Sequence, residues 1–555
     1  MSRRLRAIRR AVQLAVLALF VYLFLGTVYP LQTALPVNSF LRLDPLVAGT
    51  TLLGLRRVLP ALIWWALPVT LLTLLLGRAF CGWLCPMGTT IDIGQRIFLG
   101  RRLRQSPTRH SRDGDGARFL PLRRVKFYLL IALLFTALMV ANNRPTPGGL
   151  RNTVGLSAVY LFDPIVTLTR SATLALYAPA QWLVKRPSVA GFLSRRLESD
   201  FVTSRPRLYQ SLEPVRTVVE GEQFFFRMAL LSALLFAVIL GLSAIAGRFW
   251  CRYLCPLGAL LGWLGRRPLV RLTVTDRCTE CGRCVGECRL AAISADDPHV
   301  HLAAECTDCY TCVDVCPERA IEFRLGFSRG RRVTALDLSR RRVLGAAGAG
   351  AAFVLLSRTD WSAKLDQAGR IKVSGSKLIR PPNARPEPEF VTACVRCGEC
   401  MKICPTNGLQ PAVGEAGLEG FWTPILVPRI GPCAAPCNLC GEVCPTDAIR
   451  PFTIEEKTKL FIGTAVIDRN RCIAWFADRT CLICDEACSY DAIYQKTVDG
   501  RQRPVIDEPK CVGCGLCEKA CPVQPQAAIE VFAESPLRRT ASVRPAEEST
   551  NPYGL

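Results

Sequence analysis

Cysteine is the residue type that dominates the chemistry available to this 555-residue chain, which contains 28 of them. Most fall into tight groups of four, the usage of metal or cluster ligands rather than of disulfides. In one stretch a C-x2-C-x2-C-x3-C pattern occurs twice, which is the spacing of a bacterial ferredoxin that binds two [4Fe–4S] clusters. Its members are Cys278, Cys281, Cys284, Cys288, Cys306, Cys309, Cys312 and Cys316.

In this pattern three closely spaced cysteines hold one cluster, and the fourth serves the other cluster. The first cluster is therefore predicted to use Cys278, Cys281, Cys284 and Cys316, and the second Cys306, Cys309, Cys312 and Cys288. Arg289 stands where a proline is usual. This departure affects the rigidity of the turn but removes no cluster ligand. Zinc is the alternative, but its structural sites use two pairs of ligands, so the doubled spacing favours iron–sulfur clusters.

Sixteen further cysteines form four groups whose first members follow one another at intervals of 39 residues. A fixed period indicates repeated units, each expected to be half of a ferredoxin. Sixteen thiolates suffice for four [4Fe–4S] clusters, so six are expected in all; whether the groups pair as neighbours or nested stays open. The groups are Cys394, Cys397, Cys400 and Cys404; Cys433, Cys437, Cys440 and Cys444; Cys472, Cys481, Cys484 and Cys488; Cys511, Cys514, Cys517 and Cys521.

Two Cys-x-x-x-Cys-Pro motifs hold the last four cysteines, Cys81, Cys85, Cys251 and Cys255. Residues four apart share a helix face, so both thiols of a pair can point the same way. Two such pairs brought together offer four thiolates, enough for one further metal or cluster. Reduced cysteines packed in a turn are an equally good interpretation of the spacing alone.

The elements that must position these groups divide the chain into two halves of different charge. The net charge of +25 lies wholly in residues 1–357, because residues 358–555 hold 24 basic and 24 acidic residues. A basic excess in the apolar half indicates cytoplasmic loops of a membrane protein rather than a nucleic-acid surface. Four membrane spans are predicted there, at residues 11–29, 59–76, 127–141 and 224–246.

The membrane half contains an internal duplication. In each copy an Asp-Pro step is followed by a span and then by a Cys-x-x-x-Cys-Pro motif, and both copies enter the membrane in the same sense. The second copy has an extra insertion of about 50 residues around Tyr177–Glu222. The aspartates, Asp44 and Asp163, are candidates to accept protons from a quinol, although Asp-Pro is more often a turn or helix start.

Residues 339–357 begin with three arginines and continue into a weakly apolar run rich in Gly and Ala. This order is typical of a twin-arginine export signal, and here it predicts a fifth span that remains as an anchor. A buried Ala/Gly-rich helix is the alternative, since the run is short for a span. We expect the chain beyond it to lie outside the cytoplasm.

Haem is not expected, because the three histidines lie outside the apolar spans and no Cys-x-x-Cys-His motif occurs. The predicted fold class is multi-domain: a helical membrane domain of four spans plus an anchor, with α+β ferredoxin-like domains for two and four clusters. The predicted parts are a transmembrane domain (1–265), a cytoplasmic ferredoxin domain (266–325), the signal and anchor (339–357), a linker (358–389), a periplasmic four-cluster domain (390–535) and a disordered tail (536–555).

On these motifs, residues 1–322 resemble the NapH-type membrane-bound ferredoxins of periplasmic nitrate reductase systems. Residues 339–532 resemble the NapG type and the ferredoxin-type protein of methylamine utilisation. The resemblance implies a quinol dehydrogenase in the bacterial inner membrane that passes electrons to a periplasmic reductase or c-type cytochrome, without a flavin domain. Two other interpretations stay open: an accessory factor that supplies electrons for maturation of a periplasmic redox enzyme, and electron exchange with a cytoplasmic donor.

Overall fold

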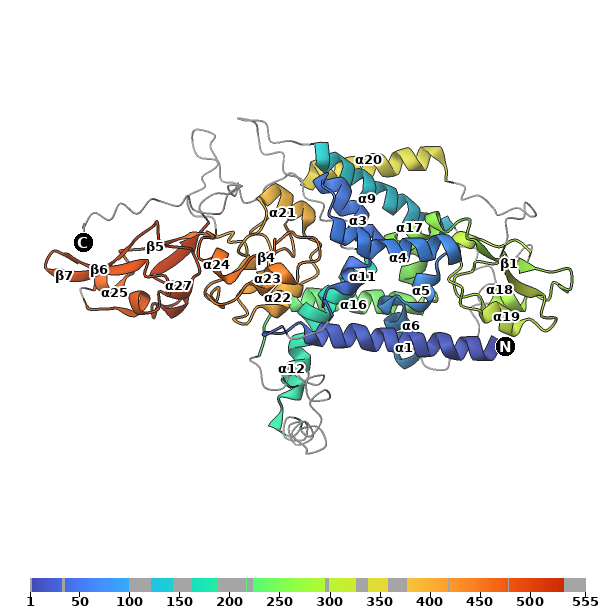
Figure 1. The fold of residues 1–555 in the computed structure, drawn as a ribbon, viewed down its shortest axis with the longest axis horizontal. Helices are drawn as coiled ribbons and strands as arrows, with labels where there is room; N and C mark the ends of the chain where they lie inside the picture. The colour runs from blue at the N-terminus through green and yellow to red at the C-terminus, as the bar shows by residue number, and fades with distance from the viewer. Residues whose placement is uncertain are drawn as a thin grey trace.

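The computed structural model describes residues 2–31, 35–98, 121–142, 162–187, 189, 216, 223–294, 299–325, 338–357, 377–417, 420–477 and 479–533. Figure 1 shows helices in the middle of an elongated molecule, with a small body of strands and short helices at either end. The ferredoxin body, around α18 and α19, lies at one end. The C-terminal body, residues 377–533, lies at the other.

The middle of the molecule, which comprises the described residues within 2–264 together with 338–357, consists mainly of helices. Their bounds are α1 (Ser2–Gly26), α2 (Ser39–Arg42), α3 (Pro45–Leu55), α4 (Pro60–Leu76), α5 (Ala79–Trp83), α6 (Pro86–Phe98), η2 (Pro121–Arg124), α9 (Val125–Asn142), α11 (Pro164–Ser171), η3 (Ala172–Tyr177), α12 (Ala178–Val184), α16 (Ala229–Gly241), η4 (Leu242–Ala244), η5 (Trp250–Leu254), α17 (Pro256–Leu264) and α20 (Arg340–Ser357).

The two end bodies are made of short helices and two-stranded antiparallel sheets. The ferredoxin body contains β1 (Val270–Val274), α18 (Arg283–Glu287), η6 (Ala303–Glu305), α19 (Thr311–Val315) and β2 (Ile321–Leu325). The C-terminal body contains α21 (Glu387–Ala393), α22 (Glu399–Ile403), β3 (Leu409–Pro411), β4 (Pro424–Leu426), α23 (Leu439–Glu442), α24 (Ile454–Lys457), β5 (Thr464–Ile467), α25 (Ile473–Phe476), α26 (Ile483–Glu486), β6 (Ile493–Val498), β7 (Arg501–Ile506), α27 (Leu516–Ala520) and β8 (Ile529–Phe532). The pairs are β1–β2, β3–β4, β5–β8 and β6–β7.

The predicted spans are matched only in part by the helices. Among the described residues, one straight helix, Arg4–Gly26, is long and apolar enough to cross a bilayer; α4 with α5 and α6 passes only as a pair bent by 100°. The fourth predicted span is shorter than expected: α16 begins at Ala229. The backbone before it is not helical and ends in a turn at Arg227–Met228; there Gln181 Oε1 accepts from Phe224 N at 3.0 Å and Gln410 Oε1 from Arg227 N at 3.0 Å. The arrangement of four spans and an anchor therefore stays a proposal.

The duplication is visible in the order of elements. A capped helix, an apolar helix, a helix of five residues and a further helix occur in this order as α3, α4, α5 and α6. The same order recurs as α11, α16, η5 and α17, with η3 and α12 between α11 and α16. Sequence reasoning missed α3 and α11 as helices, although it allowed that Asp-Pro starts one. Their apolar runs are short, and in the second copy a π-helical turn, η3, follows directly. Most of the predicted insertion lies outside the described residues.

The predicted linker differs from the structure in its second part. Within residues 377–389, Arg380 is completely buried, and its Nε donates to Glu387 Oε2 at 3.1 Å. Its Nη1 also donates to Thr423 Oγ1 at 2.7 Å. A buried cation must be paired, so this segment packs into the C-terminal body instead of running free. The first part of the predicted linker, 358–376, and the predicted tail lie outside the described residues.

Buried ion pairs attach the ferredoxin body to the helices. Glu305, which is 4% exposed, accepts from Arg78 Nη1 at 3.0 Å and from Lys126 Nζ at 2.5 Å. Trp83 Nε1 donates to the Asp308 carbonyl at 3.0 Å. One carboxylate thus neutralises cations from α9 and from the turn before α5, and fixes the ferredoxin body against both.

Replacing Glu305 with glutamine is expected to leave Arg78 and Lys126 buried without a counter-charge. Removing one partner of a buried ion pair costs about 3–5 kcal/mol, so Glu305→Gln should lower the thermal unfolding midpoint in detergent clearly. The matched control is Glu322→Gln, whose partially exposed pair with Arg324 should contribute less than about 1 kcal/mol. Equal midpoints for both variants would show that Glu305 does not hold the two parts together.

Candidate cluster-binding sites and the duplicated thiol pairs

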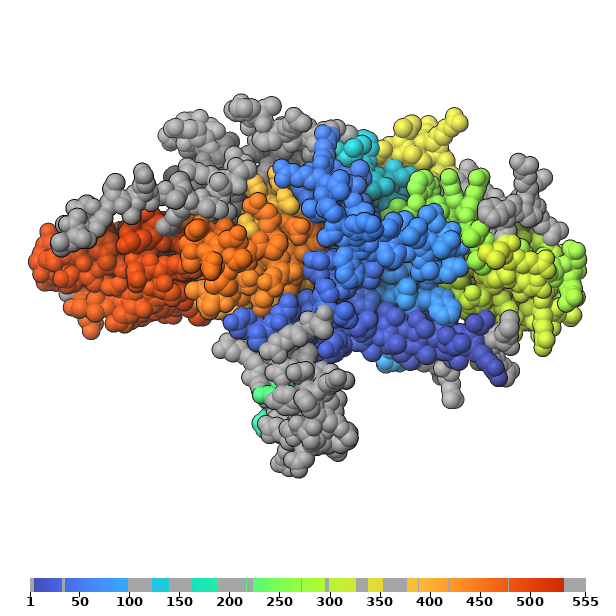
Figure 2. Space-filling view, in the orientation of Figure 1, coloured from blue at the N-terminus to red at the C-terminus, as the bar shows by residue number. Residues whose placement is uncertain are grey.

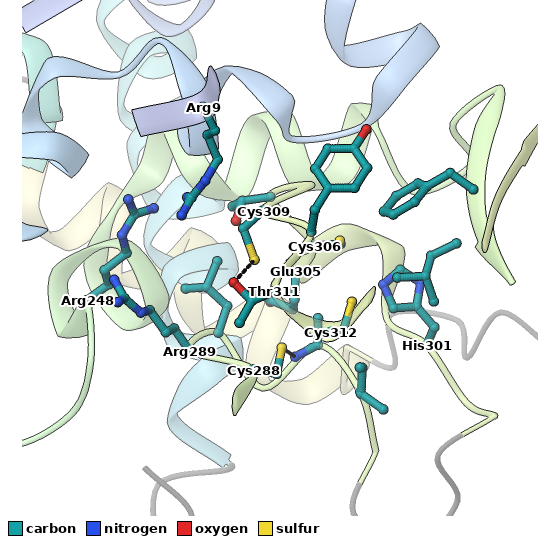
Figure 3. Close-up of a pocket in the computed structure, with 17 residues that line it drawn as sticks. Arg9, Arg248, Cys288, Arg289, His301, Glu305, Cys306, Cys309, Thr311 and Cys312 are labelled. Carbon is teal, nitrogen blue, oxygen red and sulfur yellow. Dashed lines mark hydrogen bonds between the residues drawn. The ribbon is translucent and has the colours of Figure 1, made fainter. Parts of the chain in front are cut away.

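Cysteines from different groups meet around common cavities in both end bodies. In the ferredoxin body one cavity is lined by Cys278, Cys281, Cys284 and Cys316, and a second by Cys288, Cys306, Cys309 and Cys312. These are the two sets that the spacing predicts. Figure 3 shows the second cavity, with Arg9, Arg248 and Arg289 on one side and His301 on the other.

The C-terminal body repeats this arrangement with its sixteen cysteines. Three cavities are each lined by four of them, and a fourth set of thiols lies within mutual electrostatic reach. The first group of the sequence exchanges its last cysteine with the second, and the third with the fourth. The quartets are Cys394, Cys397, Cys400 and Cys444; Cys404, Cys433, Cys437 and Cys440; Cys488, Cys511, Cys514 and Cys517; Cys472, Cys481, Cys484 and Cys521.

Four of the six quartets are positioned by a short helix that follows a residue with positive φ, which is Tyr310 (φ +57°) before α19 and a glycine in the other three. Gly398 (φ +88°) precedes α22, Gly515 (φ +83°) precedes α27 and Gly282 (φ +69°) precedes α18. Glycine tolerates this backbone conformation without strain, which lets the loop turn sharply around three sulfurs. At Gly515 a Cβ would also lie 2.5 Å from Pro428, so the loop has no room for a side chain.

Many of these thiols are buried, and burial disfavours ionisation of a thiol unless a positively charged group lies close to it. Burial raises the pKa of Cys394, raises that of Cys484 to about 12 and raises that of Cys514 to about 11. Among the described residues no three His, Cys, Asp or Glu side chains are arranged to hold a single metal ion. The donor sets are thiols in fours around a cavity, which fits an iron–sulfur cluster.

The four quartets of the C-terminal body form a series that leads away from the helices. Cys397 and Val395 pack in the same apolar core as Leu46 and Ile165 of the middle part. We call the quartet Cys394, Cys397, Cys400 and Cys444 the junction quartet. Farther out, Cys433 N donates to the Cys514 carbonyl at 2.8 Å, which joins the second quartet to the third.

Tyr490 lies at this joint and was missed by sequence reasoning. It lines the cavity of Cys488, Cys511, Cys514 and Cys517, and its electrostatic neighbours include Cys433 of the preceding quartet. Burial raises the pKa of its phenol to about 12, which keeps it neutral. Its position follows Cys488-Ser489, the one group of the four in the C-terminal body that lacks the usual proline, and this departure was the available signal.

A lysine of α22 fastens the C-terminal body to the end of α1. Lys402 is 1% exposed; its Nζ contacts the Phe24 carbonyl and donates to the Thr27 carbonyl at 3.0 Å. It also lies 4.2 Å from the centroid of the Phe24 ring and 4.8 Å from that of Tyr177. Carbonyl oxygens and aromatic faces together satisfy the buried ammonium group, so this contact fixes the junction quartet against the helices.

The four cysteines of the duplicated motifs also meet. Cys81, Cys85, Cys251 and Cys255 lie within electrostatic reach of one another, and we call them the duplicated quartet. Cys255 begins α17, and its Sγ accepts from Gly258 N at 3.2 Å. A Cβ at Gly258 would lie 2.6 Å from Arg78 Nη2, so the glycine leaves room for this guanidinium group.

Two buried arginines flank the duplicated quartet symmetrically, and sequence reasoning missed them. Arg78 precedes Cys81 by three residues, as Arg248 precedes Cys251. Arg248 binds Asp92 through two hydrogen bonds, of 2.9 Å from Nε and 2.7 Å from Nη2. The signal was present, since both copies read Gly-Arg-x-aromatic-Cys. The cations stabilise negative charge at the thiols.

Asp44 and Asp163 cap α3 and α11 and are both completely buried. The helix start that the sequence allowed is confirmed. The two carboxyl groups come from the two copies and lie within hydrogen-bonding reach of each other. They lie near the junction quartet, although its cysteines are far away in the sequence.

The comparisons with known proteins agree with this geometry. The 4Fe-4S binding domain matches residues 58–106 and 228–273, and 4Fe-4S dicluster domains match 272–323 and 479–524. The ferredoxin-type protein MauM of Methylorubrum extorquens is 35% identical over 201 residues, which is 35% of this chain and 89% of that protein. The chain belongs to the MauM/NapG family of ferredoxin-type proteins.

Other members of this MauM/NapG family are similar over comparable lengths. NapG of Escherichia coli is 34% identical over 172 residues, 29% of this chain and 72% of NapG. NapF of the same organism is 30% identical over 166 residues, 29% of this chain and 93% of NapF. No solved structure matches. The chain is therefore an iron–sulfur electron-transfer protein of the ferredoxin type with several 4Fe-4S domains.

The contact between α5 and the ferredoxin loop gives a test of how the duplicated quartet is held. A Cβ at Gly82 would lie 2.0 Å from the Thr307 carbonyl oxygen, so Gly82→Ala must push the ferredoxin body away. Overpacking of this kind costs about 1–3 kcal/mol and should lower the thermal midpoint. The control is Gly49→Ala in α3, where a Cβ meets nothing within 4 Å and the helix should gain slightly. An unchanged midpoint for Gly82→Ala would contradict this packing.

Proposed function

We propose that this protein is a membrane-bound quinol dehydrogenase that passes electrons to a periplasmic redox partner. The observation that carries the proposal is the series of four thiol quartets, which begins in contact with the helices and leads outward through the C-terminal body. Such a series suits transfer between a membrane-dissolved donor and a soluble acceptor. By their chemistry, the acceptors expected are a periplasmic reductase or a c-type cytochrome.

The six quartets of the end bodies would hold six [4Fe–4S] clusters, with the ligand sets given above. Such clusters supply reversible one-electron transfer when bound. The protein's own part is to keep the thiols together, to exclude water from them and to set the charge around them. Arg396, next to the junction quartet, contributes to this charge, since its side chain lies beside Cys394 and the residue is 2% exposed.

The duplicated quartet is proposed to hold a seventh cluster or metal. Both matches of the 4Fe-4S binding domain cover one Cys-x-x-x-Cys pair each, and the four thiols converge between two buried arginines. Arg248 also lines the cavity of Cys288, Cys306, Cys309 and Cys312 (Figure 3). This quartet thus adjoins the ferredoxin body.

Membrane placement is supported by apolar side chains that point outward from the middle part. Trp64 on α4 is 71% exposed, and Leu230 on α16 is 84% exposed. Leu14 and Val21 are also exposed; they belong to α1, the dark blue helix that runs beside the middle part in Figure 2. Exposed apolar surface around several neighbouring helices is what a lipid environment accommodates.

α20 is proposed to be the anchor left by a twin-arginine signal. It packs along α9 closely enough that a Cβ at Gly350 would lie 2.5 Å from the Ala132 carbonyl oxygen. Its arginines are at the end nearer the ferredoxin body, and its other end leads toward the C-terminal body (Figure 1). This orientation supports the proposal that the ferredoxin body lies in the cytoplasm and the C-terminal body in the periplasm.

The test of the dehydrogenase is direct reduction by quinol. Purified, cluster-loaded protein in detergent is mixed with a reduced menaquinol analogue under anaerobic conditions, and EPR spectra of reduced clusters are recorded. We expect the EPR signals of reduced clusters to grow within the mixing time. Reduction by dithionite should produce the same signals to an equal extent. Reduction by dithionite alone would contradict quinol oxidation while leaving electron transfer intact.

The seventh site is tested by iron content. Cys255→Ser should lower the iron bound per chain, because a missing thiolate weakens its whole cluster. The comparison is Cys281→Ser, which alters a quartet of the ferredoxin body and should lower iron by a similar amount. Iron loss in Cys281→Ser with none in Cys255→Ser would restrict the protein to six clusters.

A further inference from the structure

The pair of carboxyl groups from the two copies of the duplication is arranged unusually. Asp44 Oδ1 accepts from Leu46 N at 2.8 Å, and Asp163 Oδ1 accepts from Val166 N at 2.9 Å. Each side chain thereby caps a helix with one oxygen. The remaining oxygens, Oδ2 of both residues, are buried without a hydrogen-bond donor.

The two groups cannot both be ionised in these surroundings. Neither residue is exposed, and the two carboxyl groups lie within hydrogen-bonding reach of each other. Two carboxylates that close repel strongly in a low dielectric, and one proton placed between them removes the repulsion and gives the Oδ2 atoms a shared hydrogen bond.

Arg170 of α11 faces this pair and contacts the C-terminal body. Arg170, 4% exposed, has Asp163 among its electrostatic neighbours, and its guanidinium carbon lies 4.3 Å from the centroid of the Trp422 ring. The C-terminal body also contributes Arg396 and Cys397 to the surroundings of Arg170. Cys397 belongs to the junction quartet, so Arg170 stands between the carboxyl pair and that quartet.

We propose that Asp44 and Asp163 share one proton at rest and bind a second when the junction quartet gains an electron. With one proton the pair carries one negative charge, which Arg170 balances. An added electron upsets this balance in a low dielectric, and a second proton on the pair restores it. The pair is thus a proton site coupled to the charge of the junction quartet.

This inference rests on the proposed function for the source of the proton. Oxidation of one hydroquinone to quinone releases two electrons and two protons. One proton would neutralise the carboxyl pair as an electron reaches the junction quartet, and the other would leave to the aqueous phase. The second electron follows after the pair has released its proton outward.

The experiment is infrared difference spectroscopy of the full-length, cluster-loaded protein, reduced electrochemically in the absence of quinol. The expected result is a positive C=O band of a protonated carboxylic acid in the reduced-minus-oxidised spectrum, shifted in deuterated water. Asp44→Asn and Asp163→Asn should each abolish the band. The exposed Asp499→Asn, in the turn between β6 and β7, is the control and should keep it.

The asparagine variants suit the test because they preserve the structural role. An Asn side-chain oxygen caps a helix as Asp does, and its amide group can donate to the partner's Oδ2 in place of the shared proton. Iron content equal to that of the unaltered protein verifies folding. A second readout is the midpoint potential of each cluster, measured by EPR. In the unaltered protein the potential of one cluster, that of the junction quartet, should fall as pH rises. In either variant this potential should be independent of pH.

A spectrum with no carboxylic acid band, or a band retained in both asparagine variants, would overturn the proposal. So would potentials that vary with pH equally in the variants and the unaltered protein. Because electrochemical reduction needs no quinol, these outcomes are separate from a failure of quinol oxidation. A protein that fails with quinol but shows the band retains the coupled proton site.

Discussion

The constraint on which the structure depends is that each cavity takes three thiols from one loop and the fourth from another group. Neither group can complete its own set, so a ferredoxin unit is folded only when two groups have paired. This rule holds in the ferredoxin body and twice in the C-terminal body. It explains why these bodies need so little secondary structure. A cluster that bridges the two groups would add to the apolar core that the C-terminal body contains.

In the helices between the end bodies, too, each site is formed by residues from two separate parts of the chain. Their two copies contribute equivalent residues at two levels: the carboxyl pair near the C-terminal body and the duplicated quartet near the ferredoxin body. At each level a group from one copy meets its counterpart from the other. Arginine flanks both sites: Arg170 lies beside the carboxyl pair, and Arg78 and Arg248 lie beside the duplicated quartet. Duplication thus produces paired sites that a single copy could not form.

Much of the site was predictable because cysteine spacing is a local signal. The ligand sets of the ferredoxin body follow directly from the pattern, and the structure brings the same four-cysteine sets together. The pairing of the four C-terminal groups was not predictable, because all have similar spacing and only the fold determines which loops meet. Arg78, Arg170 and Tyr490 were missed for a related reason: each acts through a contact with a residue far away in sequence. The helix α16 is shorter than its apolar run because side-chain amides accept from Phe224 N and Arg227 N, and Met228 has a left-handed backbone conformation just before the helix begins.

The central claim is that the two end bodies lie on opposite sides of a membrane. The most direct measurement is protease accessibility in sealed inner-membrane vesicles of known orientation. A cleavage site is inserted either at Gly500, in the open turn between β6 and β7, or next to the exposed Arg277. The account predicts that externally added protease cuts the site next to Arg277 in inverted vesicles. It cuts the site at Gly500 in right-side-out vesicles. Cleavage of both sites from the same side would contradict it.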